Sequence, residues 1–239
     1  YEKRVVDILN CRFDVLLVHA DPALITLDRT FSRLVDLTIP VVYTGFITPK
    51  PIAAAGRRLR SRLGIGENTR LLVASAGGGQ AGIVLLQPLL ESLTFLETDR
   101  PFVLHLFTGP YMPSNEFTRL QGQANSRVKV ERFTPDFLSF LAAADLSISM
   151  GGYNTCMNIL ASRVTAIVWP YPGDREQGLR AKRMEAIGAI SVLQEKDLQP
   201  ERLAAVIRSR MIAAKPVPHA INLDGAARTA GWLQAAVAD

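Results

Sequence analysis

Near-continuous apolar runs alternate with amphipathic stretches along the chain. Such runs, unlike strictly alternating ones, are typical of parallel strands that are covered on both faces. They predict strands at Val15–His19, Val41–Tyr43, Leu71–Ala74, Phe102–Phe107, Val128–Val130, Leu146–Ser149, Thr165–Val168 and Ile190–Leu193. Helical patterns lie near residues 53–63, 83–97, 114–124, 135–144, 154–162, 177–187 and 200–213. Strands that alternate with helices indicate an α/β fold with a doubly wound parallel sheet.

Two proline-containing stretches divide this pattern. Pro49 and Pro51, after Gly45, predict a stiff, extended connector, and Pro216 and Pro218 interrupt the chain again near its end. We therefore expect a remnant of a preceding domain over residues 1–44 and a complete α/β domain over residues 45–215. Residues 216–239 are expected to form a linker and a last helix, which Asp224 can cap. The chain begins with Tyr1 rather than Met, which suggests a fragment or a processed chain.

Composition narrows the classes of function. Apolar residues make up 48% and charged residues 21% of the chain, which is typical of a packed globule. No apolar run approaches the roughly 20 residues that span a bilayer, and no signal-peptide pattern opens the chain, so we expect a cytoplasmic protein. The net charge of +5 favours anionic partners such as phosphates or lipid headgroups, which leaves peripheral membrane contact open. Nucleic acid is not expected, because no basic run with interleaved aromatic residues is present.

Isolated basic residues and thiols add little to this picture. Arg57, Arg58, Arg60 and Arg62 fall on one predicted helix, where a solvated face is the interpretation that we favour over a membrane-binding patch. Cys11 and Cys156 show no metal-ligand spacing, and no metal site is predicted.

The first unusual loop is LLVASAGGGQAG. A predicted strand ends near Ala74, Gly77, Gly78 and Gly79 follow, and a helix resumes near Ile83. Glycines let backbone N–H groups approach an anion closely, and a helix N-terminus adds positive potential. A tight turn needs fewer than three glycines, so we favour a binding function. The loop is neither a Walker A motif nor a G-x-G-x-x-G dinucleotide motif, which disfavours a nicotinamide oxidoreductase.

The second loop is SMGGYNTCMNILAS, in which Gly151 and Gly152 separate a strand from a helix. We expect Asn154 or Thr155 to cap that helix, and a turn without side chains to leave room for a phosphate at its N-terminus. Asn158 lies four residues after Asn154 and shares its face. A sugar hydroxyl ligand and a solvated helix residue are equally good interpretations of Asn158.

The third loop, WPYPGDREQG, places Asp174, Arg175, Glu176 and Gln177 between a strand and a helix. Acidic and amide groups there suit a polyhydroxyl ligand, whereas plain helix capping by Asp174, with Gln177 at the capping-box spacing, is the simpler alternative. His19 follows the first apolar run. It is a candidate catalytic base, although a structural role is the interpretation that we favour.

Together the three loops resemble the C-terminal, donor-binding domain of GT-B glycosyltransferases, and in particular glycosyltransferase family 28, the MurG-like group. The resemblance covers roughly residues 41–210 and is strongest from Phe133 to Gly188. The VHADP and YTGF segments further resemble a bacterial subgroup of predicted glycosyltransferases. The resemblance implies a GT-B, Rossmann-like sheet, with an N-terminal acceptor domain in front of this one, most of which is missing here.

The resemblance also implies ligand-binding roles. The diphosphate of a UDP-sugar would lie at the two glycine turns, the uracil beside the Phe133–Thr134 turn, and the transferred sugar at the third loop. The ribose-binding glutamate of the family falls on Asn158, which hydrogen-bonds less strongly, and its usual serine falls on Gly151. The residues implied in donor binding are Gly78, Gly79, Gln80, Phe133, Thr134, Gly151, Gly152, Asn154, Thr155, Asn158, Asp174, Arg175, Glu176 and Gln177.

The function expected from this resemblance is transfer of a hexosyl group from a UDP-sugar to the hydroxyl of an unknown acceptor. Inversion at the anomeric carbon is expected, with neither a metal nor a cofactor, since helix N-termini neutralise the diphosphate and no Asp-x-Asp motif is present. A UDP-sugar hydrolase or epimerase on the same fold is one alternative. A non-catalytic module that binds nucleotide sugars is another.

Overall fold

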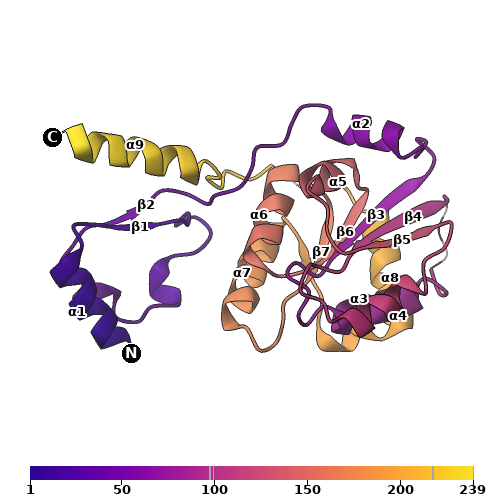
Figure 1. Cartoon of the computed structure of the whole chain (residues 1–239), viewed down its shortest axis with the longest axis horizontal. Coiled ribbons are helices and arrows are strands. Elements are labelled where there is room, and N and C mark those ends of the chain that lie inside the picture. The colour runs from indigo at the N-terminus through magenta and orange to yellow at the C-terminus, as the bar shows by residue number, and fades with distance from the viewer. Residues whose placement is uncertain (97, 99, 217, 239) are drawn as a thin grey trace. The chain divides into compact units, whose positions relative to one another are not determined.

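A computed structural model describes residues 1–96, 98, 100–216 and 218–238, and these form two compact units. The first comprises Tyr1–Thr48 and the C-terminal segment from His219, and the second comprises Pro49–Pro218 (Figure 1). The C-terminal segment therefore packs with the start of the chain. The predicted domain limits at residues 44 and 215 lie a few residues before these divisions and remain predictions.

The first unit contains a two-stranded parallel sheet. Its elements are α1 (Glu2–Arg12), β1 (Leu16–Val18), the 3₁₀ turns η1 (Leu27–Arg29) and η2 (Leu34–Asp36), β2 (Val41–Tyr43) and α9 (Gly225–Ala238). The backbone N–H of Asn222 donates to Asp21 Oδ2 at 2.7 Å, and the Thr229 hydroxyl donates to Thr44 Oγ1 at 3.0 Å. These bonds tie the C-terminal segment to the start of the chain. The helix α9 begins directly after Asp224, the residue expected to cap it.

The second unit is built on a sheet of six parallel strands. They are β3 (Arg70–Ser75), β4 (Phe102–Phe107), β5 (Val128–Glu131), β6 (Leu146–Met150), β7 (Ala166–Trp169) and β8 (Ser191–Val192), in the order β5-β4-β3-β6-β7-β8. Each predicted strand is present, and its ends either match the prediction or differ from it by one residue. The order reverses between β3 and β6, and loops at such a reversal leave a crevice at the carboxyl ends of the strands. The predicted doubly wound α/β fold is confirmed.

Helices cover both faces of this sheet. They are α2 (Ala55–Arg62), α3 (Ile83–Ser92), α4 (Ser114–Gln121), α5 (Phe137–Ala143), α6 (Tyr153–Ser162), α7 (Arg175–Ala186), the 3₁₀ turn η3 (Glu195–Leu198) and α8 (Pro200–Met211). On one face, α3, α4 and α8 contribute apolar side chains to a core with Leu72, Leu104 and Ile148 of the strands. Figure 1 shows α5 and α6 on the opposite face. There Phe107 of β4 packs edge-on against Phe140 of α5, with ring centroids 4.9 Å apart.

The arginine-rich helix α2 is not the uniformly solvated face that the sequence suggests. The Arg60 guanidinium donates to the Ala143 carbonyl at 3.0 Å and forms a salt bridge with Asp145 at 3.2 Å. A Cβ on Gly56 would lie 2.4 Å from the Ala142 carbonyl oxygen, so α2 is pressed against the end of α5. The small residue at position 56 permits this approach, and the approach brings Arg60 within reach of its partners.

His105 is a buried titratable group in the middle of β4. Its ring lies 5.1 Å from that of Phe140, and within the described part of the chain its Nδ1 has no hydrogen-bond partner. Burial lowers the pKa of His105 below its usual value, and the nearby charge of Lys129 lowers it further. The imidazole is therefore neutral in the folded protein at pH 7.

This burial predicts a pH-dependent stability. The unfolded chain binds a proton on His105 near its ordinary pKa of 6.5, whereas the folded chain does so only at lower pH. The contribution of His105 to stability is thus fully present above pH 6.5 and is lost as the pH falls toward the lowered pKa. In urea unfolding at pH 7.5 and pH 5.5, the wild type should lose more stability on acidification than His105→Leu does. Equal losses in the two proteins would contradict the prediction.

Candidate functional site

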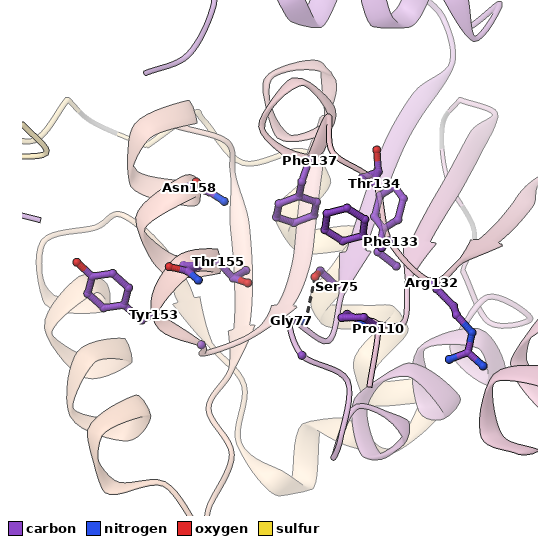
Figure 2. Close-up of a pocket in the computed structure, with 15 residues that line it drawn as sticks. Ser75, Gly77, Pro110, Arg132, Phe133, Thr134, Phe137, Tyr153, Thr155 and Asn158 are labelled. Carbon is purple, nitrogen blue, oxygen red and sulfur yellow. Dashed lines mark hydrogen bonds between the residues drawn. The ribbon is translucent and has the colours of Figure 1, made fainter. Parts of the chain in front are cut away.

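A cavity of about 420 Å³ opens at the carboxyl ends of β3, β4, β5 and β6, next to the reversal of strand order. That volume lies within the range that small-molecule ligands occupy. The ends of these strands, together with the loops and helices that follow them, supply its lining (Figure 2), namely Ser75, Gly77, Gly78, Phe107, Gly109, Pro110, Arg132, Phe133, Thr134, Phe137, Gly152, Tyr153, Asn154, Thr155 and Asn158.

The three glycines of the first loop have different structural roles. Gly77 and Gly79 have φ angles of +65° and +97°, which side chains rarely adopt. A Cβ on Gly79 would also lie 2.4 Å from the Thr108 carbonyl oxygen. Gly78 has neither constraint, since its φ is ordinary and a Cβ there would meet only the Tyr111 ring, at 3.6 Å. Neither the backbone conformation nor steric crowding therefore requires a glycine at position 78, which lines the cavity.

The loops after β3 and β4 are packed backbone against backbone. The Tyr111 N–H donates to the Gly78 carbonyl at 2.9 Å, and a Cβ on Gly109 would lie 2.4 Å from the Gly77 carbonyl oxygen. The Gly109 N–H donates in turn to the Arg132 carbonyl at 2.8 Å. These contacts fix the floor of the cavity without using side chains.

Gly79 and Gln80 do not line the cavity, and neither does the start of α3. A turn over residues 79–82 precedes the helix, with the Gly82 N–H bonded to the Gly79 carbonyl at 3.1 Å. A Cβ on Gly82 would lie 2.3 Å from that of Ala76, so this turn is pressed onto the end of β3. Of the two helix starts expected to face a ligand, the structure places only that of α6 on the cavity.

The start of α6 is bare. Its N-cap residue is Gly152, and no side chain caps it. The expectation that Asn154 or Thr155 caps the helix is wrong, because α6 begins at Tyr153 and both residues lie within its first turn. The first backbone N–H groups of a helix have no partner inside it and carry the positive end of its dipole. Gly152, Asn154 and Thr155 bring this end of α6 to the cavity.

The two glycine turns face one another across the cavity. A Cβ on Gly77 would lie 3.8 Å from Thr155 Oγ1. The Gly77 N–H itself donates to Ser75 Oγ at 3.1 Å, which holds the first turn against the end of β3 (Figure 2). A group bound at the start of α6 therefore lies beside the first glycine loop as well.

Aromatic rings form another wall of the cavity. Phe107 and Phe137 meet edge to face with ring centroids 5.9 Å apart, and Phe133 is 67% exposed although it is a large apolar side chain. Figure 2 shows Phe133 and Phe137 beside Thr134, with Asn158 on the α6 side. An exposed aromatic ring beside polar groups can pack against a flat part of a ligand.

The third loop caps its own helix. Asp174 accepts a hydrogen bond from the Gln177 N–H at 3.0 Å, and the Gln177 amide donates back to the carboxylate at 3.0 Å. The bond from the Gln177 backbone lowers the pKa of Asp174 below its usual value, so the carboxylate is charged at pH 7. The Asp174 N–H bonds to the Tyr171 carbonyl, so the reciprocal half of a capping box is not formed. Asp174, Arg175, Glu176 and Gln177 do not line the cavity.

Gly151 and Arg180 connect this third loop to the cavity. A Cβ on Gly151 would lie 3.2 Å from Pro170 Cα and 3.3 Å from Gln177 Oε1, so the turn after β6 is pressed against the third loop. The Arg180 guanidinium donates to the Gly151 carbonyl at 3.0 Å and to Glu176. Sequence reasoning missed Arg180, although its spacing of four residues from Glu176 on a helix was a usable signal.

Further lining residues were not singled out from the sequence. Gly109, Pro110 and Tyr153 follow strand ends within a few residues, which is the only signal that they carry. Arg132 lines the cavity, but its guanidinium donates to the Met112 carbonyl at 2.9 Å and lies over the Phe117 ring. His19 belongs to the first unit, where its Nδ1 pairs with Thr44 Oγ1 at 3.0 Å.

Comparisons with known proteins identify the family. A model described as the glycosyltransferase family 28 C-terminal domain matches residues 73–219, more than half of the chain. The chain belongs to glycosyltransferase family 28. The matched range contains all the lining residues of the cavity, so the site lies within the domain that defines the family.

Curated relatives are similar in sequence over part of their length. A UDP-N-acetylglucosamine–N-acetylmuramyl-(pentapeptide) pyrophosphoryl-undecaprenol N-acetylglucosamine transferase of Haemophilus influenzae (strain PittGG) is 31% identical over 144 residues, which are 60% of this chain and 40% of the relative. The transferase of the same name from Methylobacterium radiotolerans is 28% identical over 82% of this chain and 53% of its own. The family 28 chain thus spans about half or less of these relatives.

Solved structures show the same fold. MurG of Acinetobacter baumannii superposes with a TM-score of 0.59 at 16% identity, over 98% of this chain and 76% of that one. The glycosyltransferase of kitacinnamycin gives a TM-score of 0.57 at 17% identity, over 92% of this chain and 50% of that one. The family 28 chain therefore has the GT-B type of fold that its sequence implied.

No described helix is both long and apolar enough to cross a membrane. No group of three or more His, Cys, Asp or Glu side chains in the described part of the chain could hold a metal ion.

The roles of the glycines predict that two neighbouring substitutions differ in their effect on stability. Gly79→Ala should destabilise the second unit by about 2 kcal/mol or more, because it combines an unfavourable φ with a clash against the Thr108 carbonyl. Gly78→Ala should leave stability nearly unchanged, since its Cβ has room. Thermal and urea unfolding of the two variants test this. Equal destabilisation, or a larger effect at Gly78, would contradict the assignment.

Proposed function

We propose that this chain is the donor-binding part of a glycosyltransferase that transfers a hexosyl group from a UDP-sugar to an acceptor hydroxyl. The observation that carries the proposal is the bare start of α6, which opens onto a cavity of ligand size between two glycine turns. An anion is the ligand that such a helix start favours. The names of the curated relatives, which specify UDP-N-acetylglucosamine, agree with a sugar nucleotide.

The cavity offers separate surfaces for the parts of such a donor. The diphosphate would bind to the N–H groups of Gly78, Gly152 and the first turn of α6. The nucleobase would lie against the exposed ring of Phe133 beside Thr134. Asn158 lies on α6 and also lines the cavity, and its side chain would hydrogen-bond a ribose hydroxyl.

The sugar would extend from the diphosphate toward the third loop. Gly151 lies against Gln177, so this loop begins directly beside the phosphate-binding turn. The charged Asp174, together with Glu176 and Gln177, would accept hydrogen bonds from sugar hydroxyls. Gln177 bonds to Asp174 and Arg180 bonds to Glu176, and in the proposal these bonds would orient the side chains for a ligand.

The proposed reaction is a single displacement. The acceptor oxygen attacks the anomeric carbon from the face opposite the diphosphate, the glycosidic C–O bond to UDP breaks, and the configuration inverts. Negative charge that develops on the leaving diphosphate is stabilised by the backbone N–H groups and the dipole of α6, so the proposal includes no metal. The cavity's role is thus donor binding and leaving-group stabilisation.

Proton removal from the acceptor needs a different group. The lining residues of the cavity include no His, Asp, Glu or Lys. We therefore place the general base outside the cavity, with an N-terminal acceptor domain as the proposed source and His19 as a candidate from the first unit. The relatives, of which this chain spans about half or less, are long enough to contain such a domain.

A charge placed at the helix start tests the proposal. Gly152→Asp is sterically permitted, since a Cβ there meets nothing within 4 Å, and Asp is a favourable N-cap. Its carboxylate would occupy the position of the diphosphate and repel it. Isothermal titration should show UDP affinity reduced by about tenfold or more, with stability unchanged or slightly higher.

Gly66→Asp is the matched control. It adds the same charge where a Cβ also has open space, in the turn that precedes β3. This turn lies at the amino end of the strand, whereas the cavity lies at the carboxyl ends. UDP affinity should be retained in this variant. Equal UDP affinity in Gly152→Asp and the wild type, or no UDP binding by the wild type, would refute the proposed site.

A further inference from the structure

Arg180 is a buried charge that lies behind the turn after β6 and does not line the cavity. It is only 4% exposed. Because arginine is almost never buried without partners, its contacts matter for the site. Its guanidinium donates to the Gly151 carbonyl and to Glu176, and it lies 5.5 Å from the ring centre of Tyr153. Two of these partners, Gly151 and Tyr153, flank the N-cap residue of α6. The charge is thus held directly behind the turn that opens on the cavity.

The bond to Gly151 fixes the direction of the next N–H group. In a planar trans peptide, the carbonyl of one residue and the N–H of the following residue point in opposite directions. Because Arg180 holds the Gly151 carbonyl on the α7 side, the Gly152 N–H points away from α7. The Gly151 N–H also donates to the Trp169 carbonyl at 3.1 Å, which anchors the turn at its other end.

A flexible turn of two glycines needs such an anchor. Gly152 has open space around it and Gly151 has an ordinary φ, so neither residue dictates the orientation of the peptide between them. Without Arg180, that peptide is free to rotate and to turn its carbonyl oxygen toward the cavity, where it would repel an anion. Burial raises the pKa of the Cys156 thiol in α6 to about 11, and the nearby charge of Arg180 opposes that rise, so the guanidinium lies close to the first turns of this helix.

We propose that Arg180 is a positioning residue. It orients the groups that bind the donor diphosphate but does not itself contact the diphosphate. It holds the Gly151–Gly152 peptide so that the Gly152 N–H and the first turn of α6 face the cavity, and its charge adds to the positive potential there. Arg180 itself does not line the cavity. This inference rests on the proposed function, because it assumes a phosphate-bearing ligand at the start of α6.

The test compares a ligand that carries phosphates with one that does not. UDP and uridine share the base and the ribose, so their affinities, measured by isothermal titration on the full chain, separate phosphate binding from the rest of the cavity. In Arg180→Met, we expect the affinity for UDP to fall about tenfold or more, while the affinity for uridine stays within about twofold of the wild type. A general loss of structure would reduce both affinities together.

Two further variants complete the test. Arg180→Lys keeps the charge but lacks the planar fork that reaches both Gly151 and Glu176, so it should lose UDP affinity selectively even if the methionine variant does not fold. Lys182→Met removes an equal charge from the exposed side of α7 and should bind UDP as the wild type does.

The outcomes separate the two proposals. If the wild type binds UDP and the Arg180 variants either bind it equally well or lose UDP and uridine in parallel, the role of Arg180 is refuted and the proposed function stands. If the wild type binds no UDP, both fail.

Discussion

The site depends on one electrostatic arrangement, a helix N-terminus at the carboxyl ends of a parallel sheet that no side chain caps. Backbone N–H groups at a helix start need partners, and proteins commonly supply a Ser, Thr, Asp or Asn side chain. Here the N-cap residue is a glycine and no side chain caps the helix. The sheet topology places this helix start where the strand order reverses, beside the loop that follows β3. In the proposed function, an anionic ligand would accept hydrogen bonds from this helix start.

The surrounding structure holds this arrangement in place by backbone packing and by two side-chain contacts. Gly79 and Gly109 allow the loops after β3 and β4 to contact each other at distances that a Cβ would forbid. Arg180 fastens the turn after β6 to α7, and the Asp174 cap fixes the start of that helix. Rigidity matters because amides that already point toward the ligand need no reorganisation when charge develops on a leaving group. The glycines thus serve both close packing and direct exposure of the backbone.

Much of the fold was predictable from the sequence, whereas the details of the site were less so. Continuous apolar runs indicated the parallel strands, and proline-containing stretches marked the connections between the two units. The glycine turns were found because parallel topology brings strand ends together, whereas the Phe133–Thr134 turn was implied by the resemblance to family 28. The cap of α6 was predicted wrongly. Asn154 and Thr155 are good cap residues, but the helix begins at Tyr153, so the N-cap residue is Gly152. The roles of Gly79, which packs against Thr108, and of Arg180, which reaches Gly151, depend on contacts between distant segments that no local pattern encodes.

The most direct test of the central claim observes the amides themselves. In an assigned ¹H–¹⁵N spectrum of the chain, addition of UDP should shift the amide resonances of Gly78, Gly152, Asn154 and Thr155 strongly, because they would donate hydrogen bonds to the diphosphate. Uridine should leave these resonances nearly unmoved while it perturbs those of Phe133 and Thr134. If UDP moves the four amides no more than that of Gly66, at the opposite edge of the sheet, the start of α6 does not bind the diphosphate and the account is wrong.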